Sequence, residues 1–241
     1  MLRLENIEWT TPTGEKILNG IDISFPDNKL VVITGPNGGG KTTTAKIIAG
    51  LEKQQSGKIY LDDKDISDLD VTERANLGIS FAFQQPIRFK GITVRDLIQI
   101  ASPTKLNEEE LSQLLHKVGL CAKDYLDREI NAALSGGEIK RIEIATVLAR
   151  KTKISVFDEP EAGIDLWSFN NLIEVFENLR QEKNGSLIVI SHQERILSIA
   201  DIIVVIADGK VQKAGPRVML LPEILYNENS KPNCPKGREV L

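Results

Sequence analysis

The glycine-rich stretch GPNGGGKTTT, residues 35–44, decides the fold of this chain. It holds four glycines. Each glycine in ordered structure costs roughly 0.5–1 kcal/mol relative to alanine, so a ligand that needs close backbone approach must compensate. The pattern GxxxxGK[ST] is filled by Gly35, Gly40, Lys41 and Thr42. The stretch follows the apolar run KLVVIT (29–34) and precedes a run with helical spacing (41–51). Strand, glycine-rich loop and helix in this order predict a phosphate-binding loop.

Each residue type in the predicted loop has a physical role. Glycines let successive backbone N–H groups approach phosphate oxygens without a Cβ in the way, and the following helix adds its positive amino-terminal end. Lys41 supplies a charge for the β- and γ-phosphates, and the Thr42 hydroxyl can ligate Mg²⁺. The predicted nucleotide-binding residues are Gly35, Pro36, Asn37, Gly38, Gly39, Gly40, Lys41, Thr42 and Thr43. We therefore expect a nucleoside triphosphate with Mg²⁺ as the ligand.

A second motif, ISVFDE (154–159), is an apolar segment that ends in two acids. In a parallel sheet the end of such a strand lies at the carboxyl edge, beside the phosphate loop. There Asp158 can hold the Mg²⁺ shell, and Glu159 can orient and deprotonate a water molecule. The plain alternative for an acidic pair is the solvated start of a loop, but the intact phosphate loop favours the catalytic interpretation.

Amino-acid composition and charge restrict the class of protein to which this chain can belong. The chain has 241 residues, 41% hydrophobic and 27% charged, which is typical of a soluble globular protein. Its net charge of −4 gives no electrostatic reason to expect a nucleic-acid partner. Cys121 and Cys234 have no metal-ligand spacing and indicate free thiols in a reducing compartment. The start of the chain lacks the pattern of a signal peptide, and the longest apolar run (196–207) is too short to cross a bilayer, so we expect a cytoplasmic location.

Strand-like runs alternate with helical segments along most of the chain, which predicts an α/β fold with a mostly parallel sheet. The β-rich start predicts an added antiparallel β-subdomain. We expect a single domain, with a nucleotide-binding core and the β-subdomain at about 1–90 and 150–215, a helical subdomain at about 91–149, and a C-terminal tail at about 216–241. Asn107 is expected to cap a helix in the helical subdomain.

The segment LSGGE (134–138), followed by IKRIEIATVLAR, resembles the signature motif of ATP-binding cassette (ABC) ATPases. The resemblance covers about residues 1–215, with the family's motifs in order. It implies a P-loop NTPase fold with a helical signature subdomain, and hydrolysis of ATP with Mg²⁺ as cofactor. It also implies that Gln84 of FAFQQP contacts Mg²⁺ and water, and that His192 of VISHQ touches the γ-phosphate. The implied catalytic residues are Glu159, His192, Gln84 and Lys41, and the implied metal ligands are Thr42, Gln84 and Asp158.

The signature motif also presents backbone donors suited to an anion, because its glycines precede a helix. Such a cluster would be redundant with the phosphate loop inside one chain. The family resemblance implies that two copies pair head to tail in the presence of ATP, each signature motif covering the γ-phosphate in the other copy. The residues implied to act across this homodimer are Ser135, Gly136, Gly137 and Glu138. EAGID (161–165) corresponds to the family's D-loop, which includes Asp165.

Within the family, YLDREINAALSGGEIKRIEI (125–144) resembles the SufC ATPases of iron–sulfur cluster assembly, and so does ISHQERIL (190–197). Transport subunits often carry glutamine where this chain has Glu138. The resemblance implies a SufB-like scaffold partner. The DEP start of residues 158–160 is closer to transport ATPases, and the helical stretch 91–133 is shorter than in bacterial SufC. The alternative is therefore a subunit that energises a membrane transporter and lies peripheral to the membrane on transmembrane partners.

The sequence permits more than one role for its two tryptophans and for its C-terminal end. Many ABC domains stack adenine on an aromatic residue near position 11, where this chain has Thr11. Trp9, on the same strand face, is a candidate for that role, and a buried tryptophan at a sheet end is the equal alternative. Trp167 is expected to pack the helix after the D-loop. The proline- and charge-rich end with Cys234 predicts an extended tail rather than a ligand site.

Overall fold

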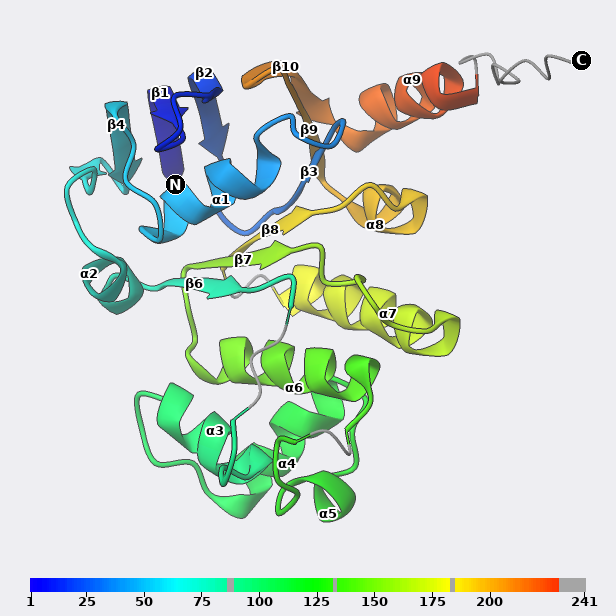
Figure 1. The fold of residues 1–241 in the computed structure, drawn as a ribbon. Helices are drawn as coiled ribbons and strands as arrows, with labels where there is room; N and C mark the ends of the chain where they lie inside the picture. Colours follow the sequence, from blue (N-terminus) through cyan, green and yellow to red (C-terminus); the bar gives the residue numbers. More distant parts are fainter. Residues whose placement is uncertain (86–88, 132–133, 183–184, 230–241) are drawn as a thin grey trace, which may run out of the picture.

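The structure, a computed structural model, describes residues 1–85, 89–131, 134–182 and 185–229. It contains a small antiparallel sheet and a larger sheet (Figure 1). The strands of the small sheet, in the order β2-β1-β4-β5, are β1 (Leu2–Thr10), β2 (Lys16–Phe25), β4 (Ser56–Leu61) and β5 (Lys64–Asp65). This sheet is the predicted antiparallel β-subdomain.

The larger sheet has six strands in the order β10-β9-β3-β8-β7-β6. Five of them form parallel ladders, and only β10 runs antiparallel to its neighbour. Their bounds are β3 (Leu30–Thr34), β6 (Ile79–Ala82), β7 (Ile154–Asp158), β8 (Ser186–Ile190), β9 (Ile202–Ala207) and β10 (Lys210–Pro216). The mostly parallel α/β fold is confirmed. Because β3 lies between β8 and β9, its carboxyl end meets theirs at one edge.

The two faces of the larger sheet are buried against different layers. Along β3, Leu30 and Val32 belong to one hydrophobic cluster, whereas Val31 and Ile33 belong to the other. The second cluster joins this sheet to the small sheet through α1 (Lys41–Ala49). The first cluster packs it against α6 (Gly136–Ala149), α7 (Leu166–Glu182) and α8 (Glu194–Ile199). A strand buried on both faces has no polar alternation, as KLVVIT indicates.

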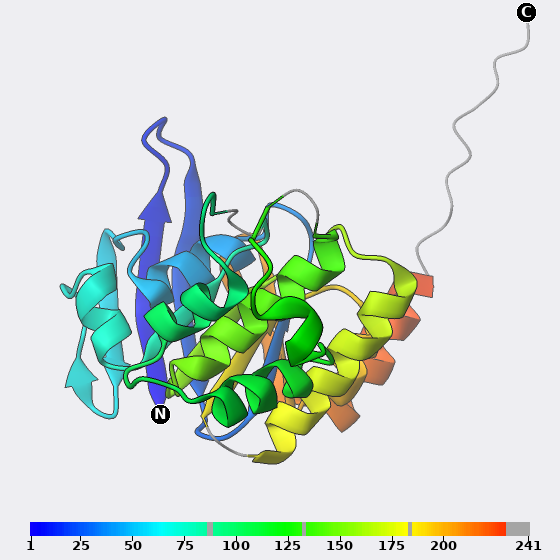
Figure 2. The same ribbon diagram turned by 90° about the horizontal axis from the view of Figure 1, so that it is seen from below.

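Three further helices pack with α6 on the side away from the small sheet (Figures 1 and 2). They are α3 (Val94–Ala101), α4 (Glu108–Lys117) and α5 (Ala122–Tyr125). Asn107 caps α4 as expected, and Glu110 completes a capping box with it. In the described ranges, no helix is both long enough and apolar enough to cross a membrane.

Outside the helical subdomain, the sequence did not predict α2 (Val71–Asn76), which Asp70 caps, nor α8, nor α9 (Arg217–Asn229). The region expected as a tail from about residue 216 therefore begins with a helix. The rest of that region, 230–241 with Cys234, lies outside the described residues.

Candidate nucleotide-binding and catalytic site

The phosphate loop lies between the end of β3 and the start of α1. Backbone angles and close contacts explain why several of its positions are glycine. Gly35 has a φ of 132°, and a Cβ there would lie 2.1 Å from the carbonyl oxygen of Ile206 on β9. A Cβ on Gly39 would lie 2.8 Å from the same oxygen. Gly40, the residue before α1, has a φ of 101°. The loop can follow this path against β9 only without side chains at these positions.

Lys41 is the first residue of α1 and only 7% exposed. Its Nζ donates to the carbonyl oxygens of Gly35 and Pro36, each at 2.8 Å. Burial lowers the pKa of Lys41, and the charges of Glu159 and Asp158 oppose that shift. The ammonium group is thus held over the loop in a partly desolvated position, where a phosphate oxygen gains a strong charge-assisted hydrogen bond.

Thr42 and Asp158 meet although 116 residues separate them in the sequence. The Thr42 hydroxyl donates to Asp158 Oδ1 at 3.0 Å. Asp158 ends β7 and is 3% exposed, and burial raises the pKa of its carboxyl group. Among the described residues no cluster of acidic, histidine or cysteine side chains could hold a metal alone. A hydroxyl and a carboxylate suit Mg²⁺, which commonly takes its other ligands from water and substrate phosphates.

Glu159 follows directly and adopts a φ of 44°, which is uncommon for a residue with a side chain. Its N–H donates to the carbonyl of Ile190 at the end of β8 at 3.0 Å. The Nε2 of Gln84 donates to Glu159 Oε2 at 2.5 Å. The predicted base and the predicted Gln84 are therefore in contact. The backbone path of Glu159 turns its carboxylate toward the phosphate loop, where both residues line the same cavity.

This cavity has a volume of about 520 Å³. It is lined by Trp9, Thr11, Ile17, Asn37, Gly38, Gly39, Gly40, Lys41, Thr42, Thr43, Gln84 and Glu159. Trp9 and Thr11 come from the small sheet, so the cavity has an aromatic wall beside its phosphate-binding floor. His192 is exposed and lies outside this lining, just beyond the end of β8. The structure thus brings together most of the predicted catalytic residues, with His192 at their margin.

Glu161, a partly buried carboxylate to which the sequence analysis assigned no role of its own, lies near His192. Glu161 accepts a hydrogen bond from the Ser191 hydroxyl at 2.5 Å, and Ser191 in turn accepts one from the N–H of Gln193 at 3.0 Å. Burial raises the pKa of Glu161, and His192 opposes that shift. The bond ties the residues after β7 to the residues after β8. In the sequence, the one signal for a role of Glu161 is its position two residues after Glu159.

The signature residues form a separate site on the same chain. Ser135 caps α6, and its N–H donates to Glu138 Oε2 at 2.6 Å. The other carboxylate oxygen of Glu138 accepts a bond from the Tyr125 hydroxyl. A Cβ on Gly137 would lie 2.4 Å from the Ser168 hydroxyl, and one on Gly136 would lie 2.9 Å from the carbonyl of Gly163. The glycines of the motif therefore allow close packing against the D-loop.

Asp165 fixes the start of α7. Its carboxylate accepts hydrogen bonds from the N–H groups of Trp167 and Ser168 and from the Ser168 hydroxyl. These bonds, with those of Ser168 the strongest, lower the pKa of Asp165. Trp167 was expected to pack this helix, but that prediction was wrong, because its side chain points into solvent and the residue is 80% exposed. The helix buries its stripe through Leu172 and Phe176 instead.

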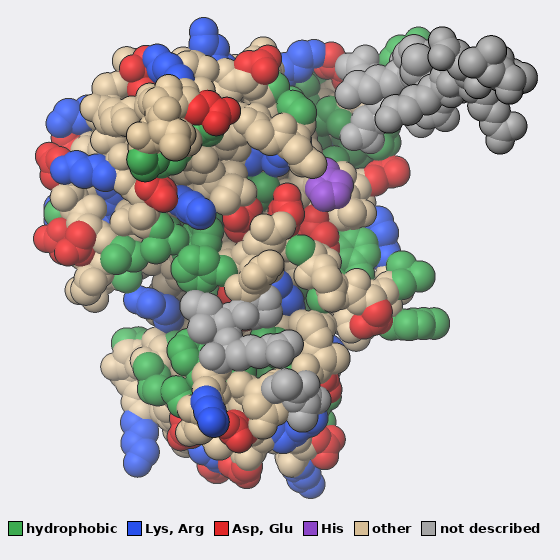
Figure 3. Space-filling model, viewed as in Figure 1, with side chains coloured by type: hydrophobic (Ala, Val, Ile, Leu, Met, Phe, Trp, Pro, Cys, Tyr) green, Lys and Arg blue, Asp and Glu red, His purple; other side chains and the backbone are tan. Residues whose placement is uncertain are grey.

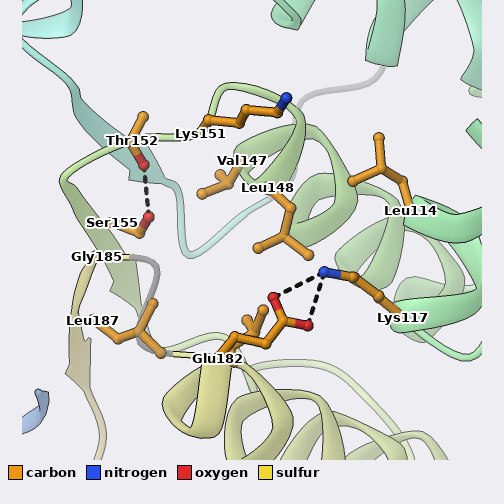
Figure 4. A pocket seen from close by; sticks show the side chains of 11 residues that line it. Leu114, Lys117, Val147, Leu148, Lys151, Thr152, Ser155, Glu182, Gly185 and Leu187 are labelled. Carbon is orange, nitrogen blue, oxygen red and sulfur yellow. Dashed lines mark hydrogen bonds and ion pairs between the residues drawn. The ribbon is translucent and has the colours of Figure 1, made fainter. Parts of the chain in front are cut away.

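A different pocket lies at the opposite edge of the larger sheet (Figure 4). It has a volume of about 440 Å³ and lies among α4, α6 and α7. The ion pair of Lys117 and Glu182, 2.7 Å apart, closes one side, and the Thr152 and Ser155 hydroxyls bond each other at 2.8 Å. Four of its polar side chains are thus paired with one another, and Lys151 also lines the pocket. Over the face shown in Figure 3, acidic and basic side chains are interspersed.

A parallel sheet whose strand ends carry a glycine-rich loop, a lysine over that loop and a Thr42–Asp158 pair defines a P-loop nucleoside triphosphatase. The family model described as ABC transporter matches residues 18–162. The chain belongs to the ABC ATPase family, binds ATP with Mg²⁺ and hydrolyses ATP.

Relatives and solved structures agree with this family. The chain is 38% identical over 223 residues to an uncharacterized ABC transporter ATP-binding protein of Methanocaldococcus jannaschii, covering 89% of this chain and 88% of that protein. It is 32% identical to the probable ATP-dependent transporter ycf16 of Cyanophora paradoxa, over 84% of this chain and 83% of that one. A solved dimeric bacterial ABC transporter cassette is 25% identical, with a TM-score of 0.80 over 90% and 99% of the two chains. ABC cassettes of this fold thus form dimers.

The position of Trp9 gives a testable prediction. Stacking of adenine on an aromatic side chain contributes ~1–3 kcal/mol. If Trp9 stacks, replacement by alanine weakens ATP binding roughly tenfold and leaves the binding of inorganic tripolyphosphate unchanged. Thr11→Ala, in the same cavity wall, serves as the matched control. Calorimetric titration that shows equal losses for ATP and tripolyphosphate would reject the stacking role.

Proposed function

We propose that this protein is a SufC-like ATPase that drives a conformational change of a SufB-like scaffold during iron–sulfur cluster assembly. The proposal rests on Glu138. Many transport subunits carry glutamine at the corresponding position of the signature motif. Its carboxylate engages Ser135 and Tyr125 at once, and Arg128 approaches it at 3.8 Å. The acid therefore has a structural role of its own in the SufC-like segment.

In the proposed reaction, different residues of the chain bind the phosphates, hold Mg²⁺ and activate water. Lys41 and the loop N–H groups bind the phosphates, which excludes water from that side. Thr42, Asp158 and Gln84 would hold Mg²⁺, which neutralises phosphate charge when bound. Glu159 orients the attacking water and accepts its proton. His192 would contact the γ-phosphate from the end of β8.

The proposal includes a head-to-tail homodimer that assembles with ATP. Its support is the separation of two anion-binding clusters on one chain. The loop around Lys41 lines the cavity, whereas Ser135, Gly136 and Gly137 lie outside it, against the D-loop. A second copy could bring its signature residues to the exposed side of the nucleotide, so that the phosphate charge is neutralised from both sides only in the dimer.

A groove beside β6, the strand that precedes Gln84, is a candidate surface for the partner. It lies among β6, α3 and α6, has a volume of about 300 Å³ and is mostly apolar. Phe81, Leu97 and Ile139 form part of its walls, and Ile100 on its rim is 72% exposed. An exposed apolar groove is a common mark of an interaction site. Glu143 on its wall accepts a bond from the N–H of Phe83, the residue before Gln84, and this contact would link partner binding to the catalytic site.

The second candidate is the ATP-binding subunit of a membrane transporter. It is favoured by the similarity to relatives named as transporter subunits, among them a spermidine/putrescine import ATP-binding protein of Mesoplasma florum. This chain spans 60% of the length of that relative. Both candidates use the same catalytic residues, so only the partner distinguishes them.

Partner capture with a groove variant tests the proposal. We expect the tagged native protein to recover a soluble SufB-like protein, and Ile100→Asp to lose it while keeping its ATPase activity. Val218→Asp is the matched control, because Val218 is also 72% exposed but lies on α9. Recovery of a polytopic membrane protein in place of the soluble one would favour the transporter candidate and overturn the SufC-like assignment.

A further inference from the structure

Two charged side chains lie on the otherwise apolar inner face of α6, and the first is buried while the second, Glu143, is partly buried. Lys140 is 2% exposed, and its Nζ lies 3.3 Å from Glu143 Oε2 one turn further along. Their neighbours Ile139, Ile142 and Ile144 are all buried. Removing charges from water is costly, and a buried ion pair is often no more stabilising than apolar residues of the same size. General stability therefore does not account for this pair.

The pair binds both backbone polar groups of one residue, Phe83. Lys140 Nζ donates to the Phe83 carbonyl, and the Phe83 N–H donates to Glu143 Oε1 at 3.0 Å. Phe83 directly follows β6, where the chain leaves the sheet ladder. The backbone groups freed at that point would otherwise need water or other partners. The two side chains thus fix the orientation of both peptide groups of Phe83.

The next residue is Gln84, whose side chain reaches the catalytic Glu159. The Phe83 carbonyl that Lys140 holds belongs to the peptide bond that leads into Gln84. We propose that the Lys140–Glu143 pair is a clamp that positions Gln84 against Glu159. Because α6 begins at the signature Ser135, the clamp also connects the signature helix to Gln84 within one chain. This inference depends on the ATPase activity and not on the identity of the partner.

Glu143 also lines the groove beside β6. Burial raises the pKa of Glu143, and the nearby Lys140 opposes that shift. Lys140 and Glu143 are partners in an ion pair and both also bond Phe83, so replacing one alone leaves the other without its charged partner. For this reason both residues have to be replaced together in a test.

A double-mutant cycle between the clamp and Gln84 tests the proposal. We expect Lys140→Met with Glu143→Leu to lower kcat roughly tenfold to a hundredfold, as misplacement of a catalytic group does. KM for ATP should stay near that of the native protein, because the phosphate loop is untouched. In a Gln84→Ala background the same clamp change should lower kcat by less than about twofold, because the clamp acts through Gln84. Additive losses, or an unchanged kcat in the clamp variant, would overturn the proposal.

Two further variants guard against a loss of folding. Lys140→Gln with Glu143→Gln retains a donor and an acceptor for Phe83 without charge, and it is expected to recover part of kcat. The same cycle with Gln84→Ala applies to it if the apolar variant does not fold. Lys117→Met with Glu182→Leu removes another ion pair, at the opposite edge of the sheet, and should leave kcat unchanged (Figure 4). Thermal unfolding and ADP affinity verify that each variant is folded.

Discussion

Replacement of Lys41 by alanine is expected to abolish ATP hydrolysis and to weaken nucleotide binding strongly. Among the described residues that line the cavity at the phosphate loop, Lys41 carries the one cation. Loss of a preorganised donor at a site of developing charge costs roughly 10²–10³-fold in rate. A loss of that size in phosphate release, with a parallel loss in the affinity for a fluorescent ATP analogue, is the expected measurement.

The same change should leave the fold intact. Lys41 donates hydrogen bonds to the carbonyl oxygens of Gly35 and Pro36, both in the loop itself, and alanine is a strong helix former at the start of α1. Lys53→Ala is the control, because its side chain is 71% exposed and pairs with the exposed Asp68. Native-like ATP affinity and turnover in a folded Lys41→Ala variant would contradict the assignment of the whole site.

Local signals in the sequence were sufficient to predict the secondary-structure elements around the site. The strand, loop and helix about residues 29–51 follow from β-branched residues, glycines and helical spacing that act within a few residues. Asn107 caps α4 because its side chain bonds the N–H of a residue three positions later. The short helix α2 was missed because its six residues carry little hydrophobic periodicity.

Contacts between distant segments could not be predicted from these signals. Arg74 is 1% exposed because it donates to carbonyl oxygens at the end of α1 and after β5, which the sequence does not bring together. The 80% exposure of Trp167 at the start of α7 likewise has no signal in the neighbouring sequence. Lys140 and Glu143 look like ordinary helix-surface charges until α6 is packed beneath β6 and their partner Phe83 becomes visible.

Replacement of Glu159 by glutamine is the second change with a large expected effect. Glutamine keeps the shape of the side chain and an oxygen that can accept the bond from Gln84, but it cannot take a proton from water. Loss of a general base lowers the rate by roughly 10²–10⁴-fold. The charge of Glu159 also acts on Lys41 and Asp158, and removing it lessens repulsion of the phosphates. ATP binding should therefore be retained or become tighter.

Retained ATP without hydrolysis should trap the proposed dimer. In sedimentation velocity with saturating Mg-ATP, we expect Glu159→Gln to run as a dimer, and to return to a monomer with ADP or without nucleotide. Adding Lys41→Ala to this variant should abolish dimer formation, because the second copy is attracted by the bound phosphates rather than by the altered side chain. A Glu159→Gln protein that binds ATP and remains a monomer would contradict the head-to-tail pairing while leaving the phosphate site intact. That outcome would separate the two halves of the proposal, since ATP binding requires only the loop around Lys41 and dimer formation also requires the signature residues.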